Sequence, residues 1–311
     1  MFDQVRYRGA LLGLAVGDAL GTTIEFMTPG SFTPVREITG GGPFKLKPGE
    51  WTDDTSLALC LAESLIESKG FSKKDQLDRY ARWMNEGYLS SNGVCFDIGN
   101  TTRYSIRRYM STGIVDTDLK DSRVVGNGSI MRLAPVPMYY GADPVNAIEM
   151  SGESSRTTHG AKAAVDACRY MGGLIHGALN GVDKETLLSE RYAPVQDYWT
   201  THKLTSKVDA IAVGSYKEKN PPRIKGTGYA VKSLEAALWA FHNSSSFEEG
   251  CLLAVNLGDD ADTTGAVYGQ IAGAYYTSKG IPKRWSDKIV KKELITGYAD
   301  KLWRLASAHA S

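Results

Sequence analysis

The chain has 311 residues, and its 36 Lys and Arg against 35 Asp and Glu give a formal net charge of +1 at pH 7. This balance argues against binding to nucleic acid or membrane through an overall field, because neither partner would be attracted at long range. The length permits a large hydrophobic core and predicts one domain over residues 1–311.

No two of the four cysteines have the sequence spacing of a metal-binding or redox motif, which favours a reducing, intracellular compartment. The N-terminal residues lack the apolar segment of a signal peptide. No run of about eighteen apolar residues, the length that a membrane helix needs, occurs in the chain. We therefore expect a soluble, cytoplasmic protein.

The first predicted helix covers residues 7–21 and contains Gly9, Gly13 and Gly17 among apolar residues. Glycine in a helix interior costs up to about 1 kcal/mol relative to alanine. Three such glycines therefore indicate either close packing against another helix or close approach to a ligand.

Two carboxylates lie in or just after this helix. Asp18 interrupts an apolar helix, and a buried, hydrogen-bonded structural group is favoured over a direct functional role. Glu25 follows the helix between two apolar residues, a setting that raises a carboxyl pKa and suits acid/base chemistry. A solvated loop residue is the alternative for Glu25.

Two clusters of neighbouring carboxylates and hydroxyls each precede an apolar helix: residues 51–55, Trp-Thr-Asp-Asp-Thr, and residues 257–264, Leu-Gly-Asp-Asp-Ala-Asp-Thr-Thr. Like charges this close raise one another's pKa unless a cation lies between them. Oxygen ligands of this kind suit Mg²⁺, Mn²⁺ or Ca²⁺ rather than Zn²⁺. The alternative is that both clusters are only helix starts, where Asp and Thr are favoured.

Two loop segments are candidates for contact with a substrate. Residues 29–48 predict a loop that gates a cleft, because they are rich in Gly and Pro and have no periodicity. Asp97 lies in the turn-forming stretch 91–102, and it is either the N-cap of the following helix or a substrate contact. The residues alone do not decide between the two.

The glycine-rich turn 126–129, Gly-Asn-Gly-Ser, can present backbone N–H groups to an anion such as a phosphate. His159 near a later helix start is either a ligand of a phosphate or ribose or a structural histidine. Helical patterns also appear at 54–70, 72–86, 163–178 and 229–241, and small residues predict a last helix at 265–276. Few stretches alternate with period two. We therefore predict an all-α fold.

In combination and in this order, the motifs resemble those of the ADP-ribosylglycohydrolase family over about residues 7–279. The resemblance is carried by the motifs at residues 17–21, 25–26, 51–55, 126–132, 158–159, 234–241, 260–263 and 269–274. It implies a compact orthogonal bundle of helices that removes ADP-ribose from a modified protein side chain with two Mg²⁺ or Mn²⁺ ions.

The resemblance also implies roles for individual residues. The family's metal motifs fall on Thr52, Asp53, Asp54, Asp260, Asp262 and Thr263. The glutamate that lies near the metals in serine-specific relatives matches Glu25. The aspartate of the Asp-x-Gly segment in arginine-specific relatives matches Asp97. Substrate contacts are expected from Gly126, Asn127, Gly128, Ser129 and His159, with Tyr229 as the candidate to stack on adenine. One departure is Asp259, where many relatives have a glycine.

Asp97 favours arginine as the acceptor, because a carboxylate matches the planar donors of a guanidinium. The alternatives are the same reaction on serine, a two-metal phosphoesterase, and an antitoxin-like role in which the chain binds an ADP-ribosyltransferase. The expected partner is an ADP-ribosylated protein.

Overall fold

The protein is described by a computed structural model that covers residues 2–117 and 125–310. In these ranges the regular structure is helical, with fifteen α-helices, one short 3-10 helix and two isolated β-bridges, which confirms the all-α prediction. The helices are α1 (Gln4–Gly21), η1 (Thr22–Ile24), α2 (Asp53–Glu67), α3 (Lys73–Glu86), α4 (Asn100–Thr112), α5 (Pro135–Tyr139), α6 (Pro144–Arg156), α7 (Lys162–Leu179), α8 (Lys184–Leu187), α9 (Tyr198–Thr201), α10 (Ser206–Ala212), α11 (Ala230–His242), α12 (Phe247–Val255), α13 (Ala261–Gly280), α14 (Lys283–Ser286) and α15 (Lys292–His309).

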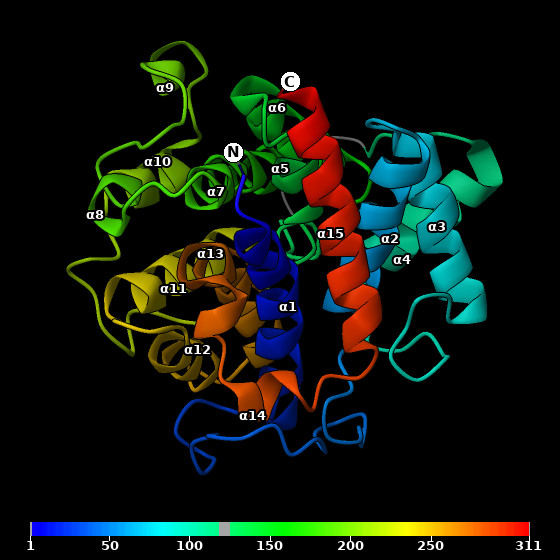
Figure 1. Cartoon of the computed structure of the whole chain (residues 1–311). Helices are drawn as coiled ribbons and strands as arrows, with labels where there is room; N and C mark the ends of the chain where they lie inside the picture. Colours follow the sequence, from blue (N-terminus) through cyan, green and yellow to red (C-terminus); the bar gives the residue numbers. More distant parts are fainter. Residues whose placement is uncertain (1, 118–124, 311) are drawn as a thin grey trace.

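Helices α1 and α13 form a central antiparallel pair in which the backbones touch (Figure 1). Glycines spaced four residues apart on each helix make this approach possible. An added β-carbon would lie 2.0 Å from a facing carbonyl oxygen at Gly9, 2.4 Å at Gly13 and 2.0 Å at Gly17, the oxygens belonging to Gly273, Gly269 and Gly265. Of the two interpretations of these glycines, the structure therefore supports close helix packing.

The same contact joins the C-terminal end of α1 to the N-terminal end of α13. A β-carbon at Gly21, the last residue of α1, would lie 2.3 Å from the carbonyl oxygen of Ala261, the first residue of α13. Glu25, just past η1, is thereby placed next to the second acidic cluster.

The other helices cover this pair. Helix α15 packs against α1 and α2, while α7, α11 and α12 pack against α13. Figure 1 shows α2, α3 and α4 on one side of the central pair and α8 to α12 on the other. Within the described ranges, no helix has both the length and the apolar character needed to cross a membrane.

Candidate metal and substrate site

The first acidic cluster is held in place by Asp18 of α1. Its carboxylate accepts hydrogen bonds from the backbone N–H groups of Thr52 (2.9 Å) and Thr55 (3.1 Å) and from both hydroxyls (3.0 and 2.6 Å). Burial raises the pKa of Asp18 to about 6 despite these donors. The structure thus supports the structural interpretation of Asp18, which fixes the start of α2.

The two clusters meet where α2 and α13 begin. Thr52 Oγ1 lies 3.3 Å from an oxygen of Asp54 and 3.3 Å from an oxygen of Asp262, and Thr263 Oγ1 lies 3.4 Å from the same oxygen of Asp54. The Thr52 hydroxyl also lies 3.0 Å from Asp18, so three carboxylate oxygens compete for its single proton. The carboxylate oxygens that meet here therefore outnumber the protons available to them.

Oxygens without a donor mark the centre of this cluster. The Oδ1 atoms of Asp54 and Asp262 are buried and have no hydrogen-bond partner among the described residues. Burial and neighbouring negative charges raise the pKa of both carboxyl groups well above the usual range, and the same causes act on Asp53. Buried carboxylate oxygens without a donor, next to hydroxyl oxygens, fit a hard divalent cation. The residues present are therefore suited to the implied metal.

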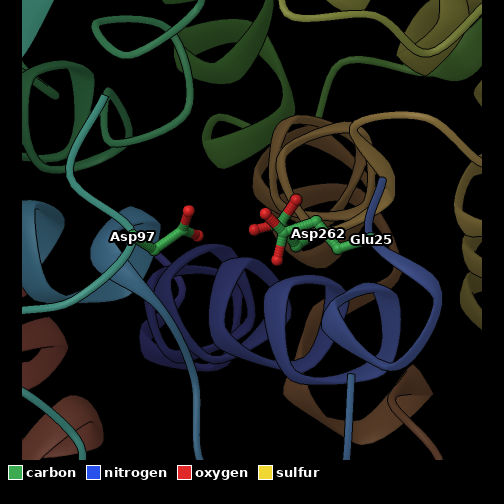
Figure 2. Close-up of side chains that lie close together, drawn as sticks. All are labelled: Glu25, Asp97 and Asp262. Carbon is green, nitrogen blue, oxygen red and sulfur yellow. The ribbon is translucent and has the colours of Figure 1, made fainter. Parts of the chain in front are cut away.

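Glu25 and Asp97 reach the same place from two other segments. One ligand atom from each of Glu25, Asp97 and Asp262 lies within 4.8 Å of the other two, and Figure 2 shows Asp97 pointing toward the other pair. Burial, followed by the charge of Asp97, raises the pKa of Glu25 to about 10. Burial, followed by the charge of Asp260, raises the pKa of Asp97 to about 7.

Two of the sequence alternatives are wrong in this light. Glu25 is not a solvated loop residue, since only 3% of it is exposed. Asp97 is not the N-cap of α4, because that position belongs to Gly99. Both carboxylates are instead held against the acidic clusters, where desolvation dominates their electrostatics.

Backbone strain accompanies the site. Phe26, Asp97 and Asp259 have positive φ angles of 63°, 59° and 53°, which are uncommon outside glycine. Phe26 N–H donates to the carbonyl of Asp259 (2.7 Å), and Asp259 N–H donates to the carbonyl of Met27 (2.8 Å). The departure at Asp259 thus joins the segment after Glu25 to the second acidic cluster through its backbone, and its side chain is partly exposed.

A cavity of about 270 Å³ opens beside the carboxylates. It brings together most of the predicted site residues: Glu25, Asp53, Asp97, Gly126, Asn127, Gly128, His159, Asp260 and Thr263. The predicted residues that do not line it are Thr52, Asp54 and Asp262, which are buried, and Ser129 and Tyr229. The Ser129 hydroxyl is buried against Ser155 (2.8 Å), whereas Tyr229 is half-buried and pairs through its backbone with Gly126.

The cavity has lining residues that sequence reasoning missed. They are Phe26, Gly99, Asn100, Thr101, Thr102, Met131 and Gly228. Residues 100–102 form the first turn of α4, so the available signal was the helix start that follows Asp97. Phe26 contacts Phe44 (ring centroids 6.5 Å apart), and Phe44 contacts Phe96 (5.3 Å), so the 29–48 loop reaches the rim of the cavity.

Asn127 connects the glycine turn to the second acidic cluster. Its Nδ2 donates to Asp260 Oδ2 (2.7 Å) and to the hydroxyl of Ser233 (3.0 Å), while its backbone N–H donates to the carbonyl of Gly228 (3.1 Å). Asp260 has a raised pKa because of burial, and the bond from Asn127 partly offsets this effect. These hydrogen bonds therefore fix the position of the glycine turn relative to the second acidic cluster.

The fold and this site place the chain in the ADP-ribosylglycohydrolase family, whose family model matches residues 3–311. The chain belongs to that family.

Two relatives illustrate the range of similarity. The chain is 42% identical over 299 residues to the ADP-ribosylarginine hydrolase Tri1 of Serratia proteamaculans, covering 96% of this chain and 79% of that protein. It is 33% identical to the ADP-ribosyl-[dinitrogen reductase] glycohydrolase of Rhodospirillum rubrum, covering 92% and 91%. A solved structure titled as an ADP-ribosylglycohydrolase-related protein complex matches with a TM-score of 0.84 and 44% identity over 97% of this chain and 98% of that one.

Proposed function

We propose that this protein hydrolyses the N-glycosidic bond between ADP-ribose and an arginine side chain of a modified protein, with the help of two Mg²⁺ or Mn²⁺ ions. The observation that carries the proposal is the meeting of two acidic clusters, with donor-free buried oxygens, beside a cavity lined by a glycine turn. The 42% identity to a relative named as an ADP-ribosylarginine hydrolase supports arginine as the acceptor.

Asp53, Asp54, Asp260 and Asp262, with Thr52 and Thr263, would hold the cations. Bound there, divalent ions supply positive charge for the ribose hydroxyls and for a water, and they offset the repulsion among the carboxylates. The glycine turn and His159 would bind the diphosphate and the distal ribose, with Tyr229 proposed to contact the adenine.

The reaction forms a bond from a water oxygen to the anomeric carbon of the ribose and breaks the bond from that carbon to the arginine nitrogen. The electron pair of the broken bond stays on the guanidine, which takes a proton and leaves as guanidinium. Positive charge develops on the ribose during this exchange. Bound cations would offset the burial and the negative charges that raise the pKa of Glu25, so that its carboxylate could accept a proton from the water and pass it to the leaving guanidine.

Asp97 would recognise the acceptor. Its carboxylate lies at the cavity and within 4.8 Å of the ligand atoms of Glu25 and Asp262, and a guanidinium is a planar cation that a carboxylate binds with charge-assisted hydrogen bonds. A serine acceptor has no such group. Asp97 therefore distinguishes the two linkages.

Replacing Asp97 by Asn is expected to lower kcat/KM for an arginine-linked substrate by about 10- to 100-fold, the worth of a charge-assisted hydrogen bond in a buried site. The loss on a serine-linked substrate should be much smaller. The measurement is release of free ADP-ribose from both substrates under single-turnover conditions. Glu25→Gln is the comparison variant, and it should slow both linkages by similar factors. Equal losses from Asp97→Asn on the two linkages would contradict arginine recognition by Asp97.

A further inference from the structure

Arg132 is a fully buried cation behind the glycine turn, and the site described above does not use it. Its guanidinium has no carboxylate within ion-pair distance among residues 2–117 and 125–310. Instead, Nη1 donates to the carbonyl oxygen of Gly128 (2.8 Å), and Nη2 donates to the hydroxyls of Thr158 (2.7 Å) and Thr157 (3.3 Å). The guanidinium also lies 4.6 Å from the ring centroid of Tyr80. A buried charge held only by neutral groups is costly, which points to a role.

The proton on the Thr158 hydroxyl has a defined direction. Arginine has no acceptor, so the Thr158 oxygen must accept the bond from Arg132 and keep its own proton for another group. The one acceptor within reach among the described residues is His159 Nδ1, 2.8 Å away. Because Thr158 is buried, leaving that proton without a partner would cost free energy. The hydroxyl therefore donates to Nδ1.

Thr157 offers a useful contrast. Its hydroxyl also accepts from Arg132, but it donates its proton to the carbonyl oxygen of Ser154 (2.7 Å). Thr157 thus helps to hold the guanidinium without any contact to the imidazole of His159.

A neutral imidazole that accepts a hydrogen bond at Nδ1 carries its proton at Nε2. The ring is neutral because burial and the charge of Arg132 lower the pKa of His159 to about 3. Nε2 lies against the glycine turn: a β-carbon on Gly126 would come within 3.1 Å of it, and one on Gly128 within 3.2 Å. All three residues line the cavity, so Nε2 lies at the cavity wall, beside the turn that is proposed to hold the anion.

We propose that Arg132 is a positioning residue that acts through Thr158 to fix His159 as its Nε2–H tautomer, so that the imidazole donates a hydrogen bond to the diphosphate of ADP-ribose. The opposite tautomer would turn a lone pair toward the phosphate oxygens. Arg132 also holds the glycine turn directly through the carbonyl of Gly128, so one buried cation sets both donors of this subsite. The inference rests on the proposed function, because it takes ADP-ribose as the ligand.

Three variants separate this relay from a general packing role. Thr158→Val keeps the shape of the side chain and removes the hydroxyl, while Arg132 retains Gly128 and Thr157 as partners. Thr157→Val makes the same chemical change at an Arg132 partner that does not touch His159. Thr158→Ser restores a hydroxyl at the relay position.

Two measurements on the metal-loaded protein test the proposal. Nitrogen-15 NMR of labelled histidine, with the His159 signals assigned from their loss in His159→Gln, reports the tautomer directly. We expect the Nε2–H form in the wild type, in Thr157→Val and in Thr158→Ser, and a mixture of tautomers in Thr158→Val. Calorimetry should show ADP-ribose binding about tenfold weaker in Thr158→Val alone, with binding of adenosine, which lacks the diphosphate, unchanged.

An Nδ1–H or doubly protonated His159 in the wild type would overturn the inference. This test is made on the wild type, so it does not depend on whether a variant folds. Equal losses of ADP-ribose affinity in Thr158→Val and Thr157→Val would also overturn it, because they would indicate packing alone. A wild type that binds metal but not ADP-ribose would contradict the proposed function itself. That outcome differs from the two above, which concern the tautomer of His159 and the relative affinities of the variants.

Discussion

Replacing Asp262 by Asn is expected to lower ADP-ribose release by about 1,000-fold or more, since a metal site supplies several kcal/mol of transition-state stabilisation. The same change should raise the melting temperature of the metal-free protein. Asp262 Oδ1 is buried without a donor, and burial and the charges of Glu25 and Asp54 raise its pKa well above the usual range. Asn carries no charge, so the variant avoids the cost of burying this carboxylate or of protonating it when the metal-free protein folds, a cost that the wild type retains for metal binding.

Differential scanning calorimetry with and without Mn²⁺ checks both halves of this prediction. The wild type should gain stability on adding the metal, because a ligand that binds only the folded state stabilises it, and Asp262→Asn should gain much less. Asp259→Asn is the matched control, since it makes the same change beside the cluster at a side chain that is partly exposed. A metal-induced stabilisation of Asp262→Asn equal to that of the wild type would contradict the assignment of Asp262 as a ligand.

Asp262→Asn also tests the binding alternative. A hydrolase acts by chemistry, so the inactive variant should fail to protect a target protein from an ADP-ribosyltransferase. Protection that persists in this variant would reveal a second role, in which the chain binds the transferase.

Replacing Gly17 by Ala is expected to reduce the free energy of unfolding by about 3 kcal/mol or more, because overpacking here meets backbone rather than a movable side chain. The added methyl group would lie 2.0 Å from the carbonyl oxygen of Gly265. Relief requires α1 and α13 to move apart, which would also separate Asp18 and Glu25 from Asp262. We therefore expect the folded fraction of the variant to be less active than the wild type.

Urea denaturation measures the stability change, and Gly297→Ala is the control. Gly297 lies within α15, and an added β-carbon there would meet nothing within 4 Å. Alanine should therefore stabilise that helix by about 0.5–1 kcal/mol through its higher helix propensity. Similar destabilisation from both substitutions would refute the view that the α1–α13 contact is what requires glycine.

Much of the helical framework follows from the sequence, because its periodicity is local. The glycines of α1 predicted close packing, and the helix now seen as α13 was predicted from its small residues. Which helix faces which could not be predicted, since both α1 and α13 present small residues and one sequence does not record their pairing. Helices α6 and α15 were not predicted. Helix α6 buries Ser151, Ser154 and Ser155, so its inner face does not stand out as apolar.

The candidate site shows the same division. Adjacent carboxylates before two helices indicated a metal site without any tertiary information, since their repulsion needs a cation. Whether Glu25 was solvated and whether Asp97 was an N-cap depended on where distant segments fold, so both stayed open. Ser129 was proposed from the glycine turn, yet its hydroxyl points to Ser155 in the core. A motif fixes the backbone turn, but the surrounding packing decides which side chains reach the cavity.

The most direct measurement is release of ADP-ribose from an arginine-ADP-ribosylated protein by the metal-stripped wild type, before and after addition of Mg²⁺ or Mn²⁺. We expect negligible release without metal and full release after its return. Undiminished release from protein shown to contain no metal would contradict the central claim that the two acidic clusters form a catalytic cation site.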